Sequence, residues 1–147
     1  AVDELASRVK PLTGVVGAFS PEQVVTVPDR VLPNQTLFGS TGGVHAAAAF
    51  DSSLEVVVAR EDVGRHNAVD KVVGRLLFDG HLPAADLGLF VSGRASFEMV
   101  QKAWAAGFGT LVSVSAPTAL AVETARRAGM TLYGFVRDGS AVRYSPA

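Results

Sequence analysis

Residues 54–79 read LEVVVAREDVGRHNAVDKVVGRLLFD, and this stretch decides the fold. Its first seven residues, Leu54–Arg60, form a short run rich in β-branched valine, which predicts a buried strand. Over Arg65–Asp79 the apolar residues recur about every 3.6 positions, which predicts an amphipathic helix. Its inner side would carry Val69, Val72, Val73, Leu76 and Leu77. The stretch therefore predicts a strand that leads directly into a helix.

The same alternation continues to the end of the chain. Further strands are predicted at Leu87–Ser92, Thr110–Val114 and Thr131–Val136, and helices at Ser96–Ala106 and Pro117–Ala128, with Gly129 ending the last helix. After the turn dipeptide Asp138-Gly139, Val142–Tyr144 can return as a hairpin. Strand and helix repeated in this way predict an α/β fold: a mostly parallel sheet with helices on both faces.

The first third of the chain is less regular. A short helix is predicted over Val2–Lys10, and Ser20 with Pro21 is typical of a helix start. Prolines at positions 28 and 33 allow only short elements there. The alanine-rich run Val44–Phe50 is expected to be a small helix. We therefore expect one domain over residues 1–147, with an irregular helical lead-in at 1–40 and an α/β core at 41–147.

Composition excludes several classes of protein. The 147 residues carry 13 Lys+Arg against 14 Asp+Glu, a net charge of −1, which argues against a general nucleic-acid binder. At 48% hydrophobic and 18% charged residues, the chain is unlike a disordered one. No apolar run approaches the roughly 18 residues needed to cross a bilayer. The cysteine count is 0, which removes disulfides, thiolate metal sites and thiol nucleophiles from this chain.

Polar residues gather where strands lead into helices, and in α/β sheets such junctions bind ligands. In the first junction, Glu61–Asn67, His66 and Asp70 stand four apart on the predicted helix, as do Asn67 and Lys71. A carboxylate at that spacing can orient an imidazole ring. The alternative is the ordinary solvated face of an amphipathic helix, and the segment alone does not decide between them.

Four other segments show similar polar density. These are Ser92-Gly93-Arg94-Ala95-Ser96, Ser115-Ala116-Pro117-Thr118, Thr41-Gly42-Gly43 with His45 just inside the predicted helix, and Phe135–Ser140. Taken alone, each is weak evidence of a site: the serine and threonine segments are better explained as capped turns, Thr41–Gly43 as a helix start, and Phe135–Ser140 as an ordinary hairpin. Together, at one sheet edge, their arginines, glycines and hydroxyls suit an anionic, hydroxyl-rich ligand, with a nucleotide or pyrophosphate the leading type.

Competing chemistries lack their motifs. There is no phosphate-binding G-x-x-x-x-G-K-[ST] loop and no G-x-S-x-G nucleophile elbow. The three histidines, His45, His66 and His81, show no metal-ligand spacing, so no metal site is expected.

At these junctions the sequence resembles the formate dehydrogenase accessory sulfurtransferases, the FdhD family. The longest matching stretch, EDVGRHNAVDK, lies within Arg60–Gly74 and is highly specific. The other matching stretches, in family order, are Thr41–Phe50, Ser92–Ala103, Ser115–Ala125 and Thr131–Gly139.

The resemblance implies a cytoplasmic homodimer with a cytidine deaminase-like fold. It implies binding of molybdenum bis(molybdopterin guanine dinucleotide), for which nucleotides like GDP would be mimics. It also implies sulfur transfer from a cysteine desulfurase to the metal centre of a molybdenum or tungsten formate dehydrogenase, with no nucleic-acid or membrane partner. Deamination is not expected, because deaminases hold zinc with His-x-Glu and paired cysteines, and Val44-His45-Ala46-Ala47 has no such glutamate.

The resemblance also implies which residues bind the cofactor. Phe135, Val136, Arg137, Asp138, Gly139 and Ser140 match a segment assigned to it. The same pocket would be lined by Thr41, Gly42, Gly43, His45, Asp62, Gly64, Arg65, His66, Asn67, Lys71, Ser92, Gly93, Arg94, Ser96, Ser115, Ala116, Pro117 and Thr118.

The chain departs from the family at one decisive point. The family carries persulfide on a Cys-x-x-Cys motif upstream of the segment that matches here, and this chain has 0 cysteines. We expect the C-terminal part of a longer protein, or else a homologue that cannot carry persulfide; the first residue, Ala1, favours the former. No catalytic residue is expected within the chain. Two alternatives remain: a non-catalytic module that binds partner proteins, and a nucleotide hydrolase or transferase with His66 and Asp70 as the general base pair.

Overall fold

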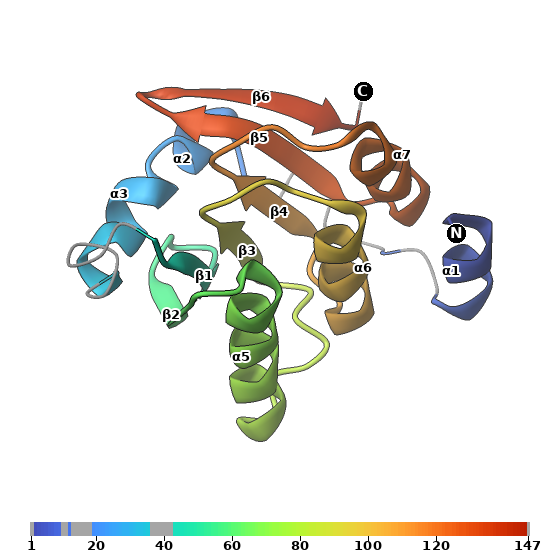
Figure 1. Ribbon diagram of the computed structural model, residues 1–147, viewed down its shortest axis with the longest axis horizontal. Helices are drawn as coiled ribbons and strands as arrows, with labels where there is room; N and C mark the ends of the chain where they lie inside the picture. The colour runs from blue at the N-terminus through green and yellow to red at the C-terminus, as the bar shows by residue number, and fades with distance from the viewer. Residues whose placement is uncertain (1, 10–11, 13–18, 36–42, 147) are drawn as a thin grey trace.

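A single mixed sheet organises the computed structural model, which describes residues 2–9, 12, 19–35 and 43–146 (Figure 1). Its six strands lie in the order β2-β1-β3-β4-β5-β6. They are β1 (His45–Phe50), β2 (Val56–Asp62), β3 (Gly88–Val91), β4 (Thr110–Ser113), β5 (Thr131–Arg137) and β6 (Ser140–Ser145). The predicted strands and the closing hairpin are thus confirmed, with shifts of one or two residues at their ends.

The prediction of a mostly parallel sheet is wrong. Only β3–β4 and β4–β5 pair in parallel, whereas β1–β2, β1–β3 and β5–β6 are antiparallel. The physical reason is β1, which lies between β2 and β3 and runs opposite to both. As a consequence β2, β3, β4 and β5 all still point the same way. The resemblance to the cytidine deaminase-like fold stays a prediction.

The segment Val44–Phe50, predicted as a helix, contains β1 instead. Alanine favours helices when nothing else decides, but Ala46–Phe50 is buried throughout. Its side chains alternate between two cores: Ala47 and Ala49 belong to one, and Ala48 and Phe50 to the other. A strand covered on both faces shows a continuous apolar run rather than an alternating one. Burial on both faces therefore overrides the helical preference of alanine.

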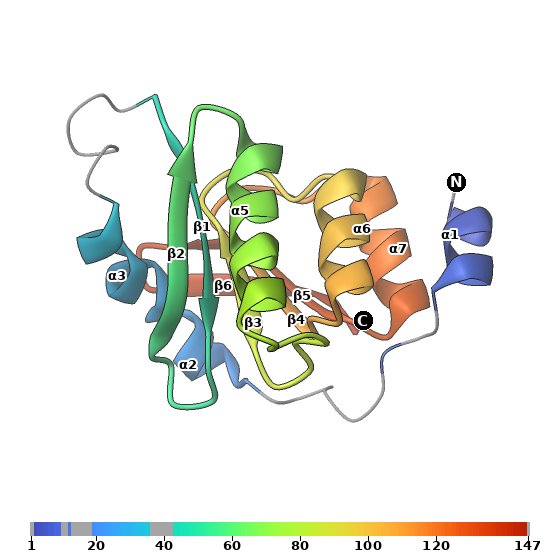
Figure 2. The same ribbon diagram turned by 90° about the horizontal axis from the view of Figure 1, so that it is seen from below.

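Helices cover both faces of the sheet, as predicted (Figure 2). One face carries α5 (Arg65–Phe78), α6 (Phe97–Ala106) and α7 (Ala119–Ala128), and α1 (Val2–Arg8) lies beside α7. The other face carries α2 (Pro21–Val24) and α3 (Val27–Val31). Helix α3 continues into the 3-10 turn η1 (Leu32–Asn34). The two cores lie on either side of the sheet. Trp104 of α6 is among the largest buried side chains of the first, and Phe90 of β3 belongs to the second.

The helix ends follow the sequence signals closely. Ser20 forms a capping box with Gln23, and Gly129 ends α7 in the left-handed conformation at φ 74°. In α5, Val69, Val72 and Leu76 are buried as predicted, but Leu77 is 66% exposed. That part of the predicted inner stripe is wrong, because Leu77 lies on the solvent side of the last turn of α5, next to Phe78, which is 82% exposed.

No helix within the described ranges is both long and apolar enough to span a lipid bilayer.

Candidate functional site

Five polar segments lie at one end of the sheet. His45, the first residue of β1, pairs with Asp62, the last residue of β2, and Ala47 pairs with Val91 at the end of β3. Because β3, β4 and β5 are parallel, the segments that follow them emerge at this same end. The turn between β5 and β6 is also here. Although β1 is antiparallel to its neighbours, the predicted junctions therefore still lie at one end of the sheet, and the N-terminus of β1 lies there with them.

A cavity of about 540 Å³ opens at this end, on the face of the sheet that α3 covers. Its floor is apolar and comes from β3, β5 and the segment after β4. Its rim comes from the start of β1, the end of β3 and the β5–β6 turn, and α3 with η1 forms the opposite wall. The lining residues are Pro28, Asp29, Leu32, Gln35, Gly43, Val44, His45, Phe90, Ser92, Gly93, Val114, Val136, Arg137 and Asp138.

The β5–β6 turn presents Arg137 in an unusual local backbone. Phe135 has φ 51°, in the left-handed region that a bulky residue seldom adopts, and Asp138 follows at φ 54°. The guanidinium of Arg137 lies 5.3 Å from the centroid of the Phe135 ring, a cation–π distance. The Ser140 hydroxyl donates to the Arg137 carbonyl at 3.2 Å, but no ion pair or hydrogen bond engages the Arg137 guanidinium in the described part of the chain. Such strained backbone is concentrated at functional sites.

Close packing holds this turn against the segment after β4. The backbone N–H of Phe135 donates to the carbonyl of Ser115 at 3.2 Å. Gly134 is required here, since a Cβ at that position would lie 2.7 Å from Cδ of Pro117 and 2.9 Å from the Tyr144 ring. Ser115 and Pro117 thus position the turn through their own backbone and ring atoms.

The end of β3 and the start of β1 are joined at the rim. The hydroxyl of Ser92 accepts from the backbone N–H of Ala46 at 2.9 Å, and the carbonyl of Gly93 accepts from the hydroxyl of Ser113 at 2.7 Å. A Cβ at Gly93 would lie 3.3 Å from Nδ1 of His45 and 4.0 Å from Cδ of Arg65. The absence of a side chain at Gly93 therefore lets His45 and Arg65 approach the same point.

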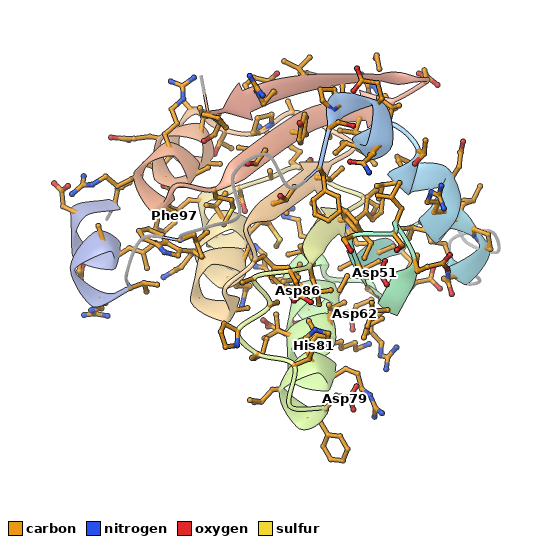
Figure 3. The ribbon with its side chains drawn as sticks, turned by 180° about the vertical axis from the view of Figure 1, so that it is seen from behind. Asp51, Asp62, Asp79, His81, Asp86 and Phe97 are labelled. Atoms are coloured by element: carbon orange, nitrogen blue, oxygen red, sulfur yellow. The ribbon has the colours of Figure 1, made fainter. Side chains whose placement is uncertain are left out.

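Asp62, at the end of β2 and labelled in Figure 3, is the centre of a local polar network. Its carboxylate lies 2.7 Å from Nζ of Lys71 and accepts from the backbone N–H of Gly64 at 2.9 Å and the Asn67 amide at 3.3 Å. The hydrogen bond from Lys71 and the one from Gly64 hold the pKa of Asp62 at about 2. Asp62, Gly64, Asn67 and Lys71 are therefore brought together, but they bind one another and do not line the cavity.

The predicted pairing of His66 with Asp70 is wrong. Asp70 instead accepts from Nζ of Lys102 on α6 at 2.7 Å, because the two helices are packed side by side. Nε2 of His66 is buried and has no hydrogen-bond partner among the residues that the structure describes. His66 and Asp70 therefore do not form the hydrogen bond on which the predicted general base pair depended.

For two hydroxyls the alternative of simple helix caps is confirmed. The Ser96 side chain accepts from the N–H of Met99 at 3.4 Å, and the Thr118 side chain accepts from the N–H of Ala121 at 3.1 Å. Thr118 is the N-cap of α7, so Pro117 precedes the helix instead of occupying its first turn as predicted.

The predicted site residues thus divide into groups. Gly43, His45, Ser92, Gly93, Val136, Arg137 and Asp138 line the cavity. Arg65 reaches its rim at Gly93. The residues described but not in the lining are Asp62, Gly64, His66, Asn67, Lys71, Arg94, Ser96, Ser115, Ala116, Pro117, Thr118, Phe135, Gly139 and Ser140. Thr41 and Gly42 lie outside the described residues.

Sequence reasoning missed the wall formed by α3 and η1, which contributes Pro28, Asp29, Leu32 and Gln35. The two prolines in this region indicated only that its elements are short. The floor residues Phe90 and Val114 gave no separate signal either, because apolar residues of a strand suit a core and a cavity floor equally well. Across the described residues, no group of three or more His, Asp or Glu side chains is arranged to hold a metal ion.

Comparison with known proteins shows the fold and the family. The solved structure of a proposed formate dehydrogenase accessory protein from Desulfotalea psychrophila superposes with a TM-score of 0.84 at 28% identity, covering 97% of this chain and 60% of that one. Proteins named sulfur carrier protein FdhD are similar in sequence. The one from Bordetella bronchiseptica is 56% identical over 128 residues (87% of this chain and 46% of the relative), and the one from Corynebacterium efficiens is 46% identical over 144 residues (98% and 50%).

The chain spans about half the length of these curated relatives. The family model described as FdhD/NarQ matches residues 2–147, that is, nearly the whole of this chain. The chain therefore belongs to the FdhD/NarQ family.

Proposed function

We propose that this chain is the part of an FdhD-type sulfur carrier that binds a guanine dinucleotide form of molybdopterin. The observation that supports this most strongly is the cavity at the carboxyl end of the sheet, with Arg137 at its rim and no carboxylate paired with that arginine in the described chain. An unpaired guanidinium is the natural partner of a phosphate, because its planar fork can donate two parallel hydrogen bonds.

The size and lining of the cavity fit a nucleotide. Its volume of about 540 Å³ is within the roughly 300–1,000 Å³ typical of small-molecule sites. The apolar part of the lining, where Val114 is partly exposed beside the buried Phe90 and Val136, suits a flat heterocycle, and Ser92 and Arg137 add polar groups and charge. One cavity thus offers both kinds of surface that a nucleotide requires.

The role of this chain is binding and orientation. With 0 cysteines it has no thiol that could carry sulfur, so a persulfide would have to come from a Cys-x-x-Cys elsewhere in the whole protein. The metal carried by the bound cofactor, and not the pterin itself, would be the acceptor of that sulfur. We further propose that the whole protein acts in the cytoplasm as a homodimer, accepts sulfur from a cysteine desulfurase and serves formate dehydrogenase, as the family membership suggests.

Calorimetry with GDP as the probe tests the proposal. The folded chain is expected to bind GDP saturably, and guanosine, which lacks the phosphates, much more weakly. If a folded sample shows no heat of binding at millimolar GDP, the proposal is refuted. If guanosine binds as tightly as GDP, the part assigned to Arg137 is refuted.

A further inference from the structure

Two opposite charges line the same cavity without pairing. Arg137 stands on the β5–β6 turn, and Asp29 stands on α3, which forms the opposite wall. No ion pair or hydrogen bond engages the Asp29 carboxylate in the described part of the chain. A cavity lined by both an unpaired cation and an unpaired anion is complementary to a ligand that carries both negative charge and N–H donors.

The backbone of α3 gives Asp29 a defined position. Val27 and Val31 are 1% and 0% exposed and anchor the helix in the core beneath it. Asp29 lies two residues from each of them, so it does not enter the core with them, and it lines the cavity together with Pro28 and Leu32. The carboxylate therefore stands on a wall that is packed in place, and ligand binding would not have to order the helix first.

We propose that Asp29 selects the nucleobase in this cavity, a role that rests on the proposed binding of a nucleotide. A carboxylate only accepts hydrogen bonds, and it can do so with two oxygens side by side. Guanine has two adjacent donors, its N1–H and its exocyclic amino group, whereas adenine has an acceptor at N1 beside its amino group. Asp29 would therefore accept both hydrogen bonds from guanine and would repel the adenine N1 lone pair.

The second carboxylate of the lining, Asp138, is the natural comparison. Asp138 has φ 54°, a conformation that Asp and Asn both tolerate, and it lies beside Arg137 at the end that would hold the phosphates. Replacing Asp138 by Asn removes a negative charge from the same cavity without changing the turn. The variant therefore separates a general effect of charge from recognition of the base.

The experiment measures the dissociation constants of GDP, IDP and ADP for the wild-type chain, Asp29→Asn and Asp138→Asn. The wild-type chain is expected to bind GDP at least about tenfold more tightly than ADP, with IDP between them, since one bidentate contact discriminates between bases by about that factor or more. Asp29→Asn is expected to reduce the GDP:ADP preference about tenfold, because an amide pairs its oxygen and its NH₂ with the adenine edge instead. Asp138→Asn is expected to leave the preference unchanged.

Three outcomes would overturn the inference. Equal affinity of the wild-type chain for GDP and ADP removes base selection while leaving the nucleotide cavity intact. If the preference for GDP over ADP is unchanged in Asp29→Asn, or is lost only in Asp138→Asn, then a residue other than Asp29 selects the base. If neither nucleotide binds the folded wild-type chain, the proposed function fails and this inference fails with it. Because Asp29 is exposed, its Asn variant should fold normally, which circular dichroism checks.

Discussion

The guanidinium of Arg137 lies 5.3 Å from the ring centroid of Phe135, two residues earlier on β5. Phe135 adopts φ 51°, and the register of β5 against β6 shifts between Gly134 and Arg137. This irregular backbone ends the regular pairing of the hairpin where the cavity begins. This arrangement places the Arg137 guanidinium at the rim of the cavity against the ring of Phe135. The N–H groups of the guanidinium stay available to an anion.

The first prediction concerns Arg137. Arg137→Ala is expected to weaken GDP binding by about 1.5–3 kcal/mol, the usual value of a hydrogen bond to a charged group. Arg94 serves as the matched control, because it follows β3, a strand that points the same way as β5, but does not line the cavity. Calorimetry on both variants should show the larger loss for Arg137→Ala. Equal losses, or none, would be inconsistent with the assigned contact.

The second prediction concerns the ring of Phe135. Phe135→Leu keeps an apolar side chain but removes the π face, so GDP affinity should fall by about 0.5–1 kcal/mol, as for an exposed cation–π contact. The free energy of unfolding should change little, since the side chain is only partly buried. Urea titration and calorimetry measure the two quantities. A loss of stability with unchanged affinity would mean that the ring packs the turn and does not orient the arginine.

The third prediction concerns acid stability. The pKa of Asp62 is about 2 in the folded chain, below its ordinary value of 3.8, so folding favours the charged form. The resulting stabilisation is complete above the unfolded value and is lost as the pH falls from about 4 toward 2. In Asp62→Asn this pH-dependent part should be missing. Urea unfolding between pH 5 and pH 2 should show the wild-type and variant curves converging as the pH falls.

Lys71→Met is the control for that experiment, because it removes the partner cation and leaves the carboxylate. It should reduce the same pH-dependent part without removing it, since the hydrogen bond from Gly64 remains. Parallel stability curves for the wild-type chain and Asp62→Asn across the whole pH range would show that the pKa of Asp62 is not lowered.

The fourth prediction concerns packing at the start of β3. A methyl group added at Gly88 would overlap the ring of Phe50, which is 1% exposed and fully packed. Gly88→Ala should destabilise the chain by about 1–3 kcal/mol. Gly74→Ala in α5 is the matched control: nothing lies within 4 Å of its added methyl, and it should stabilise the helix by up to about 1 kcal/mol. Urea titrations that gave both changes the same sign would be inconsistent with this packing.

Most of the fold could be predicted from local signals in the sequence. The helix from Arg65, the caps at Ser20 and Gly129, and the hairpin at Asp138-Gly139 each depend on residues close together in the chain, and all are confirmed. The failure at Val44–Phe50 has a different cause. Whether an alanine run becomes a helix or a buried strand depends on what covers it, and the residues that cover β1 come from distant parts of the chain.

The candidate site could be predicted only on its sheet side. Strand ends that point the same way meet at one edge, so Ser92, Gly93 and Arg137 converge as the alternation indicated. The wall from α3 was not predictable in this way, because no local pattern specifies where a short helix packs. For the same reason the spacing of His66 and Asp70 was misleading, because the Asp70 carboxylate pairs with Lys102 of another helix, α6, and not with His66.

The most direct test of the central claim is to map where GDP binds on the folded chain. Amide chemical-shift mapping during a GDP titration should show its largest changes at residues 43–45, 92–93 and 136–138, and at Asp29 on the opposite wall. It should show none at the other end of the sheet, where Phe50 pairs with Gly88, around Asp51, His81 and Asp86. Changes confined to that other end, or no changes at millimolar GDP, would contradict the account.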